Sequence, residues 1–275
     1  MHQGQKSEPP VRGIVCYYSG SGNTRLACRY IAKRIRNVEL DLFDIVNADL
    51  PDLAEYDLVG LATFADFFGP PRLIQSFVEA LPRQNDKPVF VFNSFCLVSG
   101  RTLRVLDRWV TAKGFLVVAG YSLHTPETYP PWIVRGLRSK KAPKKKAMSR
   151  FNTFIAELDQ ICAGLQQGCP PVRKKPGIGL INSLVPVFPR TAARWNMGVK
   201  YVEAALCTRC GICAERCPYQ AIKLDPLPVF AMERCYGCWR CYNQCPELAI
   251  YTRWYRGIGH YPEPPEALKA KLGKV

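Results

Sequence analysis

The sequence predicts an α/β protein in which a parallel sheet, covered by helices on both faces, is followed by a small α+β domain. Two observations support this prediction. Apolar runs of strand length alternate with helical patterns from Arg12 to Gln166, and such alternation implies a parallel sheet with helices on both faces. Eight of the 13 cysteines then fall between Cys207 and Cys245, which sets the second part of the chain apart.

Five strands and four helices account for the first domain. Short, bounded apolar runs place strands at residues 12–18, 39–46, 57–63, 87–93 and 115–123. Helical patterns place helices at residues 23–36, 70–81, 101–113 and 147–166. The second helix begins at two prolines, which suit the first turn of a helix. The last helix has one apolar stripe that suits it to cover a sheet face, formed by Phe151, Phe154, Ile155, Leu158, Ile161, Cys162 and Leu165.

We expect the chain to divide into four segments. Residues 11–168 form the α/β domain, 169–200 a basic, proline-rich linker, 201–255 the cysteine-rich domain and 256–275 a C-terminal tail. The linker contains the apolar stretch 177–188, GIGLINSLVPVF, for which packing between the domains is favoured over a shallow contact with a membrane or a partner. The polar start of the sequence and the lack of a long apolar run are typical of a cytoplasmic protein.

The chain is strongly basic, with 38 Lys and Arg against 22 Asp and Glu and a net charge of +16. Between Glu127 and Lys200 there are 14 basic and only 3 acidic residues. A positive field of this kind attracts acidic proteins, nucleic acid or an anionic membrane. Nucleic acid is disfavoured because the lysine run has neither interleaved aromatic residues nor a recognition motif.

The turn between the first strand and the first helix reads YSGSGNT, residues 18–24. A Gly/Ser/Thr-rich turn at this place surrounds an anion with N–H groups and hydroxyls at the positive end of a helix. The turn has no lysine, which favours a phosphate held without a point charge over a triphosphate. A helix start with a flexible turn is the alternative. The candidate phosphate ligands are Ser19, Gly20, Ser21, Gly22, Asn23 and Thr24.

This turn resembles the phosphate loop of the flavodoxin family, S/T-x-S/T-G-x-T, which residues 19–24 match at every fixed position. The resemblance covers residues 11–166 and implies a flavodoxin-like, doubly wound sheet of order 2-1-3-4-5 with FMN at the carboxyl ends of its strands. It also implies that the loops after the third and fourth strands hold the isoalloxazine ring. These loops supply the candidates Thr63, Phe64, Ala65, Phe67, Gly69, Asn93, Ser94, Phe95, Cys96, Ser99 and Gly100.

Three aromatic residues of these loops, Phe64, Phe67 and Phe95, are candidates to stack on the flavin, and core packing is the alternative for each. Cys96 is interpreted as a small apolar residue and not as a redox group.

The cysteines form an internal repeat with a constant offset, in which Cys207, Cys210, Cys213 and Cys217 recur as Cys235, Cys238, Cys241 and Cys245. Both copies have the C-x2-C-x2-C-x3-C-P spacing of [4Fe–4S] ligands, in which the fourth cysteine of a run binds the other cluster. We therefore expect cluster I to take Cys207, Cys210, Cys213 and Cys245, and cluster II to take Cys235, Cys238, Cys241 and Cys217. Zinc is disfavoured because a tetrahedral site would leave the third cysteine of each run unused. Residues 201–252 resemble the bacterial two-cluster ferredoxins.

FMN and two [4Fe–4S] clusters in one chain predict an electron-transfer protein that passes electrons between them and to or from a protein redox partner. The combination resembles flavodoxin–ferredoxin proteins of anaerobes. The alternative is an FMN-dependent reductase of a small acceptor such as a quinone, fed by its own clusters. The sequence has no dinucleotide fingerprint and only three histidines, His2, His124 and His260, which disfavours that alternative.

The basic charge predicts that the partner has an acidic docking face. The residues expected to meet it are Arg135, Arg138, Lys140, Lys141, Lys144, Lys145 and Lys146. A peripheral membrane contact through residues 177–188, with Arg173, Lys174 and Lys175, is the second expectation for a partner.

Overall fold

The computed structural model describes residues 11–188 and 191–273. Its larger part is a five-stranded sheet of order β2-β1-β3-β4-β5, in which every neighbouring pair is parallel. This order is flavodoxin-like and confirms the predicted fold class. The strands are β1 (Val11–Tyr17), β2 (Val38–Asp44), β3 (Leu58–Phe64), β4 (Lys87–Phe95) and β5 (Phe115–His124).

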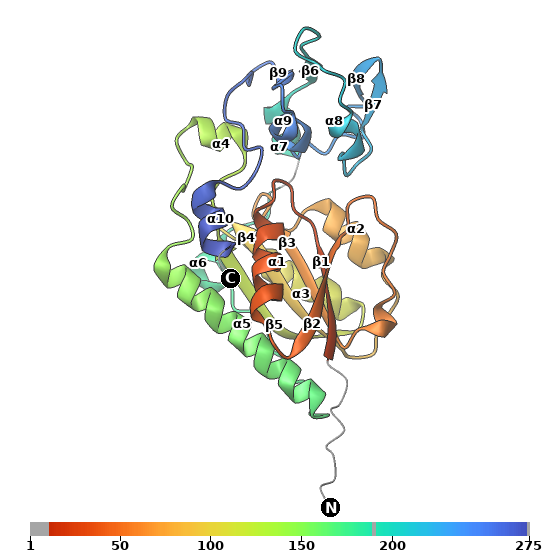
Figure 1. Ribbon diagram of the computed structural model, residues 1–275, viewed down its shortest axis with the longest axis vertical. Coiled ribbons are helices and arrows are strands. Elements are labelled where there is room, and N and C mark those ends of the chain that lie inside the picture. Colours follow the sequence, from red (N-terminus) through yellow and green to blue (C-terminus); the bar gives the residue numbers. More distant parts are fainter. Residues whose placement is uncertain (1–10, 189–190, 274–275) are drawn as a thin grey trace, which may run out of the picture.

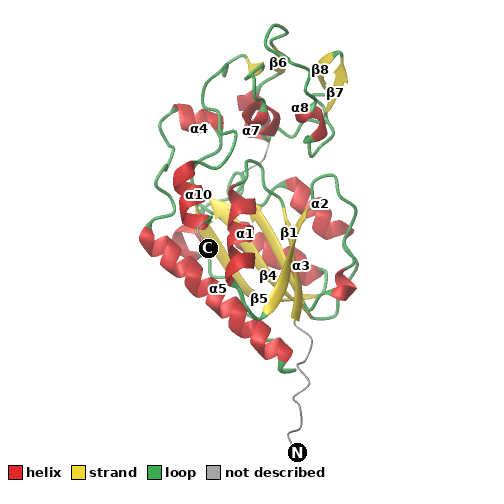
Figure 2. Ribbon diagram, viewed as in Figure 1, coloured by secondary structure: helices red, strands yellow, loops and turns green. Residues whose placement is uncertain are grey.

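Helices cover both faces of this sheet, as Figures 1 and 2 show. One core lies under α1 (Asn23–Arg34) and α5 (Lys145–Gln166), where Phe90 and Phe92 of β4 meet Phe151 and Phe154 of α5. The other core lies under α2 (Arg72–Ala80) and α3 (Thr102–Ala112). The predicted strands and helices are therefore confirmed, with ends that differ by a few residues.

The smaller part repeats one strand–helix–strand unit. The first copy is β6 (Lys200–Val202), α8 (Ile212–Glu215) and β7 (Ile222–Asp225), and the second is β8 (Leu227–Phe230), α9 (Arg240–Gln244) and β9 (Ile250–Thr252). The strands pair antiparallel across the copies, β6 with β9 and β7 with β8. The constant offset of the cysteines extends to the backbone. Pro228 is the equivalent of Lys200 in the second copy, and Leu224 is the equivalent of Thr252 in the first. Lys200 pairs with Thr252, and Pro228 pairs with Leu224 in the same way.

The linker follows the surface of the larger part. Lys174 N–H donates to the Val117 carbonyl of β5, and Arg101 donates to the Ser183 carbonyl. Two short helices interrupt the linker, α6 (Gly179–Leu184) and α7 (Thr191–Met197). Among the described residues, no helix is both long and apolar enough to cross a lipid bilayer.

The segment predicted as a C-terminal tail returns to the larger part and ends in the helix α10 (Glu266–Leu272). Figure 1 shows α10 lying beside α1. Leu268 and Leu272 are buried in the core under α1 and α5. The chain therefore crosses twice between its two parts, once through the linker and once through this segment.

Candidate cofactor sites

The predicted phosphate loop forms one wall of a cavity at the carboxyl ends of the strands. The loop turns at Gly22, whose φ of 97° is left-handed, and α1 begins at the next residue. Ser19 Oγ accepts hydrogen bonds from the N–H groups of Gly22 and Arg25, at 3.1 and 3.2 Å. A side chain at Gly22 would be strained at this φ, and its Cβ would also lie 2.9 Å from Cδ of Pro264.

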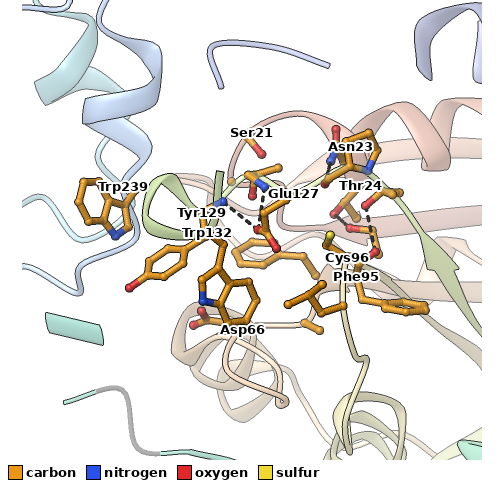
Figure 3. Close-up of a pocket in the computed structure, with 18 of the residues that line it drawn as sticks. Ser21, Asn23, Thr24, Asp66, Phe95, Cys96, Glu127, Tyr129, Trp132 and Trp239 are labelled. Carbon is orange, nitrogen blue, oxygen red and sulfur yellow. Dashed lines mark hydrogen bonds between the residues drawn. The ribbon is translucent and has the colours of Figure 1, made fainter. Parts of the chain in front are cut away.

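The cavity encloses about 880 Å³, including space open to solvent, and Figure 3 shows side chains from both parts of the chain around it. The lining includes eleven of the residues proposed for FMN, namely Ser19, Gly20, Ser21, Asn23, Thr24, Phe64, Ala65, Phe67, Ser94, Phe95 and Cys96. Hereafter it is called the flavin cavity.

Six proposed residues lie behind this lining and support it. Asn93 and Ser99 hydrogen-bond each other, and both hydrogen-bond Ser122. The Thr63 carbonyl accepts from the Thr24 hydroxyl at 3.3 Å, which ties the phosphate loop to β3. The remaining three, Gly22, Gly69 and Gly100, shape the loops and do not line the cavity.

The three phenylalanines proposed for stacking all line the flavin cavity but differ in their packing. Phe64 tilts against Tyr18 at 5.2 Å, Phe67 meets Tyr129 edge-on at 5.7 Å, and Phe95 stacks on His124 at 5.6 Å. Burial raises the pKa of the Cys96 thiol to about 12. This thiol is therefore protonated at neutral pH and is not a nucleophile.

Part of the lining lies outside the two predicted loops. Thr125–Thr128, Tyr129 and Trp132 follow β5, while Cys238, Trp239 and Asn243 come from the cysteine-rich part. No pattern in the sequence pairs these residues with the loop, because their approach depends on how the two parts pack together. Several hydrogen bonds hold that packing, including Asn243 Nδ2 to the Thr128 carbonyl at 3.1 Å and Tyr236 Oη to Asp66 at 2.9 Å.

Two buried polar atoms of the flavin cavity have no hydrogen-bond partner among the described residues, Glu127 Oε2 and Trp239 Nε1. One is an acceptor when ionised and the other is a donor. Buried polar groups of this kind are normally satisfied. Together with the hydroxyls of the loop and the unsatisfied N–H groups that begin any helix, they fit a bound group that is anionic at one end and polar along its rim, as FMN is.

Trp239 holds an unusual backbone conformation. Its φ is 63°, and the equivalent residue of the first repeat is Gly211, with a φ of 80°. A left-handed conformation costs a non-glycine residue about 1–2 kcal/mol. The Trp239 ring is buried and contacts Tyr129, Tyr242 and Tyr255 edge-on, with centroids 5.1–5.9 Å apart. This packing holds the ring beside both the flavin cavity and the cysteines of cavity II.

The eight cysteines of the repeat surround two further cavities. Cavity I is lined by Cys207, Cys210, Cys213 and Cys245, and cavity II by Cys217, Cys235, Cys238 and Cys241. These are the two crossed sets expected from the spacing. Among residues 11–188 and 191–273, no three His, Cys, Asp or Glu side chains are grouped so as to hold a single metal ion.

The surroundings of the sulfur atoms fit thiolate ligands of an iron–sulfur cluster. Ala221 N–H donates to Cys217 Sγ and Ala249 N–H donates to Cys245 Sγ, both at 3.3 Å and at equivalent places in the repeat. Such bonds stabilise negative charge on sulfur. Ile212 and Ile250 line cavity I and Ile222 lines cavity II, as expected for residues that exclude water from a cluster.

The two cavities differ in exposure. Cys210 is exposed and the other three cysteines of cavity I are partly exposed, whereas Cys217, Cys235 and Cys241 of cavity II are buried. Cys238 lines both cavity II and the flavin cavity. Cavity II is therefore the less exposed of the two cysteine-lined cavities and the one that adjoins the flavin cavity.

Comparison with known proteins agrees with this division. Residues 206–249 match the family model of the 4Fe-4S dicluster domain, so the chain contains such a domain in its C-terminal part. No curated protein is similar enough to the chain to count as a relative.

Three solved structures illustrate the likeness of the larger part. An archaeal flavodoxin has 16% identity over 56% of this chain and 99% of its own, with a TM-score of 0.41. The Streptococcus pneumoniae TIGR4 flavodoxin has 19% identity over 55% and 98%, with a TM-score of 0.41. Rubredoxin oxygen:oxidoreductase from the anaerobe Desulfovibrio gigas has 15% identity over 60% and 39%, with a TM-score of 0.43. The strand order itself, and not these likenesses, defines the fold as flavodoxin-like.

Proposed function

We propose that this protein transfers electrons between FMN in the flavin cavity and two [4Fe–4S] clusters in cavities I and II, and exchanges them with a protein redox partner. The flavodoxin-like fold and the dicluster domain suggest electron transfer in general terms. The observation that supports the specific proposal is the position of Cys238, which lines both cavity II and the flavin cavity.

The residues of the flavin cavity divide by chemistry into two ends. Residues 19–24 would hold the phosphate, and the phenylalanines together with Tyr129 and Trp132 would enclose the ring system. Bound FMN supplies one-electron and two-electron chemistry that no side chain offers. The protein contributes position, because its fold brings Trp239 and Cys238 to the rim of the cavity.

Cluster I in cavity I would exchange electrons with other proteins. Cys210 is exposed, so a partner can approach cluster I without a rearrangement of the chain. Cluster II, enclosed by three buried cysteines, would exchange electrons only within the chain.

The proposal is tested by anaerobic purification followed by flavin extraction and by assays of iron and sulfide. About eight irons and one FMN per chain are expected from two four-iron clusters. The clusters are then reduced with substoichiometric dithionite, and the flavin absorption is followed by stopped flow. Bleaching of the flavin at a rate independent of protein concentration supports transfer within the chain. Zinc in place of iron, or a colourless protein, would contradict the proposal.

The reductase alternative depends on turnover without a protein partner. His124 lies at the end of β5, and burial together with the Lys144 charge lowers its pKa, so its imidazole is largely neutral at pH 7. It stacks on Phe95 but does not line the flavin cavity. Multiple turnovers of a quinone by the purified chain would favour the reductase, and dependence on an added redox protein would favour the carrier.

The proposed docking face for an acidic partner is called the basic surface and consists of Arg135, Arg138, Lys140, Lys141, Lys144, Lys145 and Lys146. All seven are exposed, and none forms an ion pair with another residue in the described part of the chain. The surface begins shortly after Trp132, which lines the flavin cavity. A partner bound there would lie near the flavin, whereas cluster I opens elsewhere.

A peripheral membrane contact is proposed as a second interaction, through α6. Leu180, Ile181 and Leu184 are 78%, 76% and 72% exposed, which favours an apolar contact outside the chain. The adjacent charges favour it less, because Arg173 pairs with Asp107 and Lys174 with Glu157. Flotation with vesicles of phosphatidylserine and phosphatidylcholine decides the question. Binding that disappears in a Leu180→Ser, Leu184→Ser variant supports the contact, and no flotation at low salt refutes it.

A further inference from the structure

We propose that buried Lys200 raises the reduction potential of cluster II above that of cluster I, so that an electron within the dicluster domain rests beside the flavin cavity. The inference rests on the proposed function, because it assumes that cavities I and II hold [4Fe–4S] clusters. It concerns only why two clusters whose ligands have the same spacing differ in reduction potential.

The internal repeat supplies the comparison. Lys200 lines cavity II, and its equivalent in the second copy is Pro228, which lines cavity I. The second such pair is Arg240 of cavity II and Ile212 of cavity I. At two equivalent positions, therefore, a cation faces cavity II where an apolar residue faces cavity I.

Lys200 makes a direct contact with a proposed ligand. Its Nζ donates to Cys235 Sγ at 2.7 Å, and the residue is only 6% exposed. The same Nζ lies over the Phe230 ring, 5.8 Å from its centre. A positive charge and an N–H···S hydrogen bond both stabilise the more negative, reduced state of a cluster, and low solvent access strengthens the effect.

Without such a cation, burial would act in the opposite direction. The sulfur atoms of cavity II are less exposed than those of cavity I, and a drier site disfavours the added negative charge of reduction. Cavity I gains no buried charge to offset this difference, since its charged lining residues, Arg209 and Glu247, are exposed and opposite in sign. Lys200 therefore decides which cluster is reduced first.

Arg240 is the weaker of the two cations near cavity II. Its Nε and Nη1 are buried without a hydrogen-bond partner in the described part of the chain. The positive charge of Arg240 also interacts with the Asp44 carboxylate at the end of β2. This carboxylate partly cancels the effect of Arg240 on the cluster. Lys200 has no carboxylate partner among the described residues and is the residue to test.

The reduction step involves an electron alone. A one-electron donor, such as a reduced viologen, loses one electron, the cluster pair gains it, and no bond or proton changes. The proposal states that this electron resides on cluster II, whose ligand Cys238 also lines the flavin cavity.

The test is an anaerobic redox titration of the intact chain, followed by electron paramagnetic resonance of the reduced clusters. The wild-type chain is expected to show two separate potentials. In Lys200→Met the higher potential falls by at least the equivalent of a tenfold change in the reduction equilibrium, about 59 mV for one electron, while the lower potential stays in place. Lys200→Arg keeps the charge and is expected to keep the higher potential near the wild-type value.

Lys223→Met is the matched control, because Lys223 lies on β7 of the same domain but is exposed. It should leave both potentials unchanged. If Lys200→Met loses iron, Lys200→Gln, which keeps an N–H donor without the charge, is titrated instead and should show the same fall.

An unchanged higher potential, a shift of the lower one, or an equal shift in Lys223→Met would overturn the inference. These results are distinguishable from failure of the proposed function, because that failure would appear as missing iron or sulfide in the wild-type chain. Two clusters with unaltered potentials would refute only the role of Lys200.

Discussion

The Glu127 carboxylate combines burial with incomplete hydrogen bonding. One oxygen, Oε1, accepts from the N–H groups of Thr128 and Tyr129 at 2.8 and 2.9 Å, whereas Oε2 has no N–H or O–H partner among the described residues. Burial raises its pKa above the usual 4.5, although the two N–H groups and Cys96 oppose the shift. The folded protein therefore favours the protonated acid more than the unfolded chain does.

This raised pKa predicts a pH-dependent stability. The protonated acid contributes to the free energy of unfolding. This contribution is fully present below the pKa of the unfolded chain, 4.5, and is lost as the pH rises through the higher pKa of the folded protein. Glu127→Gln resembles the protonated acid at every pH, so we expect it to gain stability relative to wild type between pH 5 and pH 8. Urea unfolding of flavin-free protein across that range measures the difference. A constant difference would show that Glu127 does not titrate in this window.

The crossed cysteine sets give a prediction for single cysteines. Cys245 lies in the second sequence run but lines cavity I. We expect Cys245→Ser to weaken cluster I and leave cluster II intact, so that iron falls from about eight toward about four per chain. Exposed Cys169, outside both cavities, is the control, and Cys169→Ser should keep all the iron. Loss of the signal of cluster II in Cys245→Ser would mean that the sets do not cross.

Individual residues were predictable where their signal is local. The cysteine spacing and the turn at residues 19–24 are short motifs, and the structure brings their members together. Tyr129, Trp132 and Trp239 were not predicted for the flavin cavity, because aromatic residues after β5 and in another domain have no periodic relation to the loop that they approach. The role of Lys200 was not predicted either, because a lone lysine at the start of a strand is most often a surface residue.

The segment from Tyr255 to α10 joins the two parts of the molecule at the phosphate loop. The hydroxyl of Tyr261 donates to Asn23 Oδ1 at 2.6 Å, and Asn23 Nδ2 donates to the Pro126 carbonyl at 3.1 Å. Tyr261 N–H in turn donates to Asn243 of α9 at 3.2 Å. This segment therefore ties the orientation of a phosphate-loop side chain to the position of the dicluster domain.

Removal of the Tyr261 hydroxyl should weaken flavin binding. A buried hydrogen bond contributes about 0.5–1.5 kcal/mol, which corresponds to a loss of up to about tenfold in affinity. We expect this loss in Tyr261→Phe, measured by quenching of FMN fluorescence during titration of flavin-free protein. Tyr201→Phe removes a hydroxyl from an exposed tyrosine of β6 and should bind FMN like wild type. Equal affinity of all three proteins would mean that the segment does not hold the loop.

Docking of α10 predicts a contrast between two leucines. Leu268 is completely buried under α1, whereas Leu184 of α6 is 72% exposed. A large-to-small substitution in a core costs about 2–5 kcal/mol, so Leu268→Ala should lower the free energy of unfolding of the larger part by that amount. Leu184→Ala should change it by less than about 0.5 kcal/mol. Urea denaturation followed by far-ultraviolet circular dichroism compares them, and similar values would show that α10 does not dock.

The strands of the sheet followed from short apolar runs, because both of their faces are buried. The long helices followed from periodicity, because their apolar residues face one core over several turns. The short elements did not. α10 has only seven residues, and α4 (Pro130–Val134) has five, so neither offers enough turns to reveal a face. Their stability comes from packing against residues far away in the sequence, which a local pattern does not record.

On the scale of the whole molecule, the basic surface and cavity I lie on different parts of the chain. The basic surface lies on α5 and the loop before it, beyond Trp132 of the flavin cavity, and Lys271 of α10 adds a further cation beside Lys141 and Lys144. The dicluster domain packs at the carboxyl ends of the strands, as Figure 1 shows. A partner held by charge would therefore approach the flavin, and a partner of cluster I would need no such attraction.

This arrangement predicts a rate that depends on salt. The probe is a separate acidic ferredoxin, reduced and mixed with the oxidised protein in a stopped-flow instrument. Electrostatic steering raises association rates by about 10–1,000-fold and is lost as the screening length falls from about 30 Å at 0.01 M salt to about 3 Å at 1 M. We expect flavin reduction to slow by at least about tenfold over that range.

A second prediction is that the steering depends on the basic surface and not on the net charge of the protein. Lys144→Gln, Lys145→Gln, Lys146→Gln should lower the low-salt rate and flatten its salt dependence, because the variant removes three cations of the basic surface. Arg83→Gln, Arg104→Gln, Arg108→Gln removes the same charge from exposed positions around α3, on the opposite face of the sheet from α5. If steering comes from net charge alone, both variants will slow equally. If steering comes from docking at the basic surface, only the lysine variant will show a lower rate of flavin reduction. The rates of all three proteins will then converge at 1 M salt, where the screening length is about 3 Å.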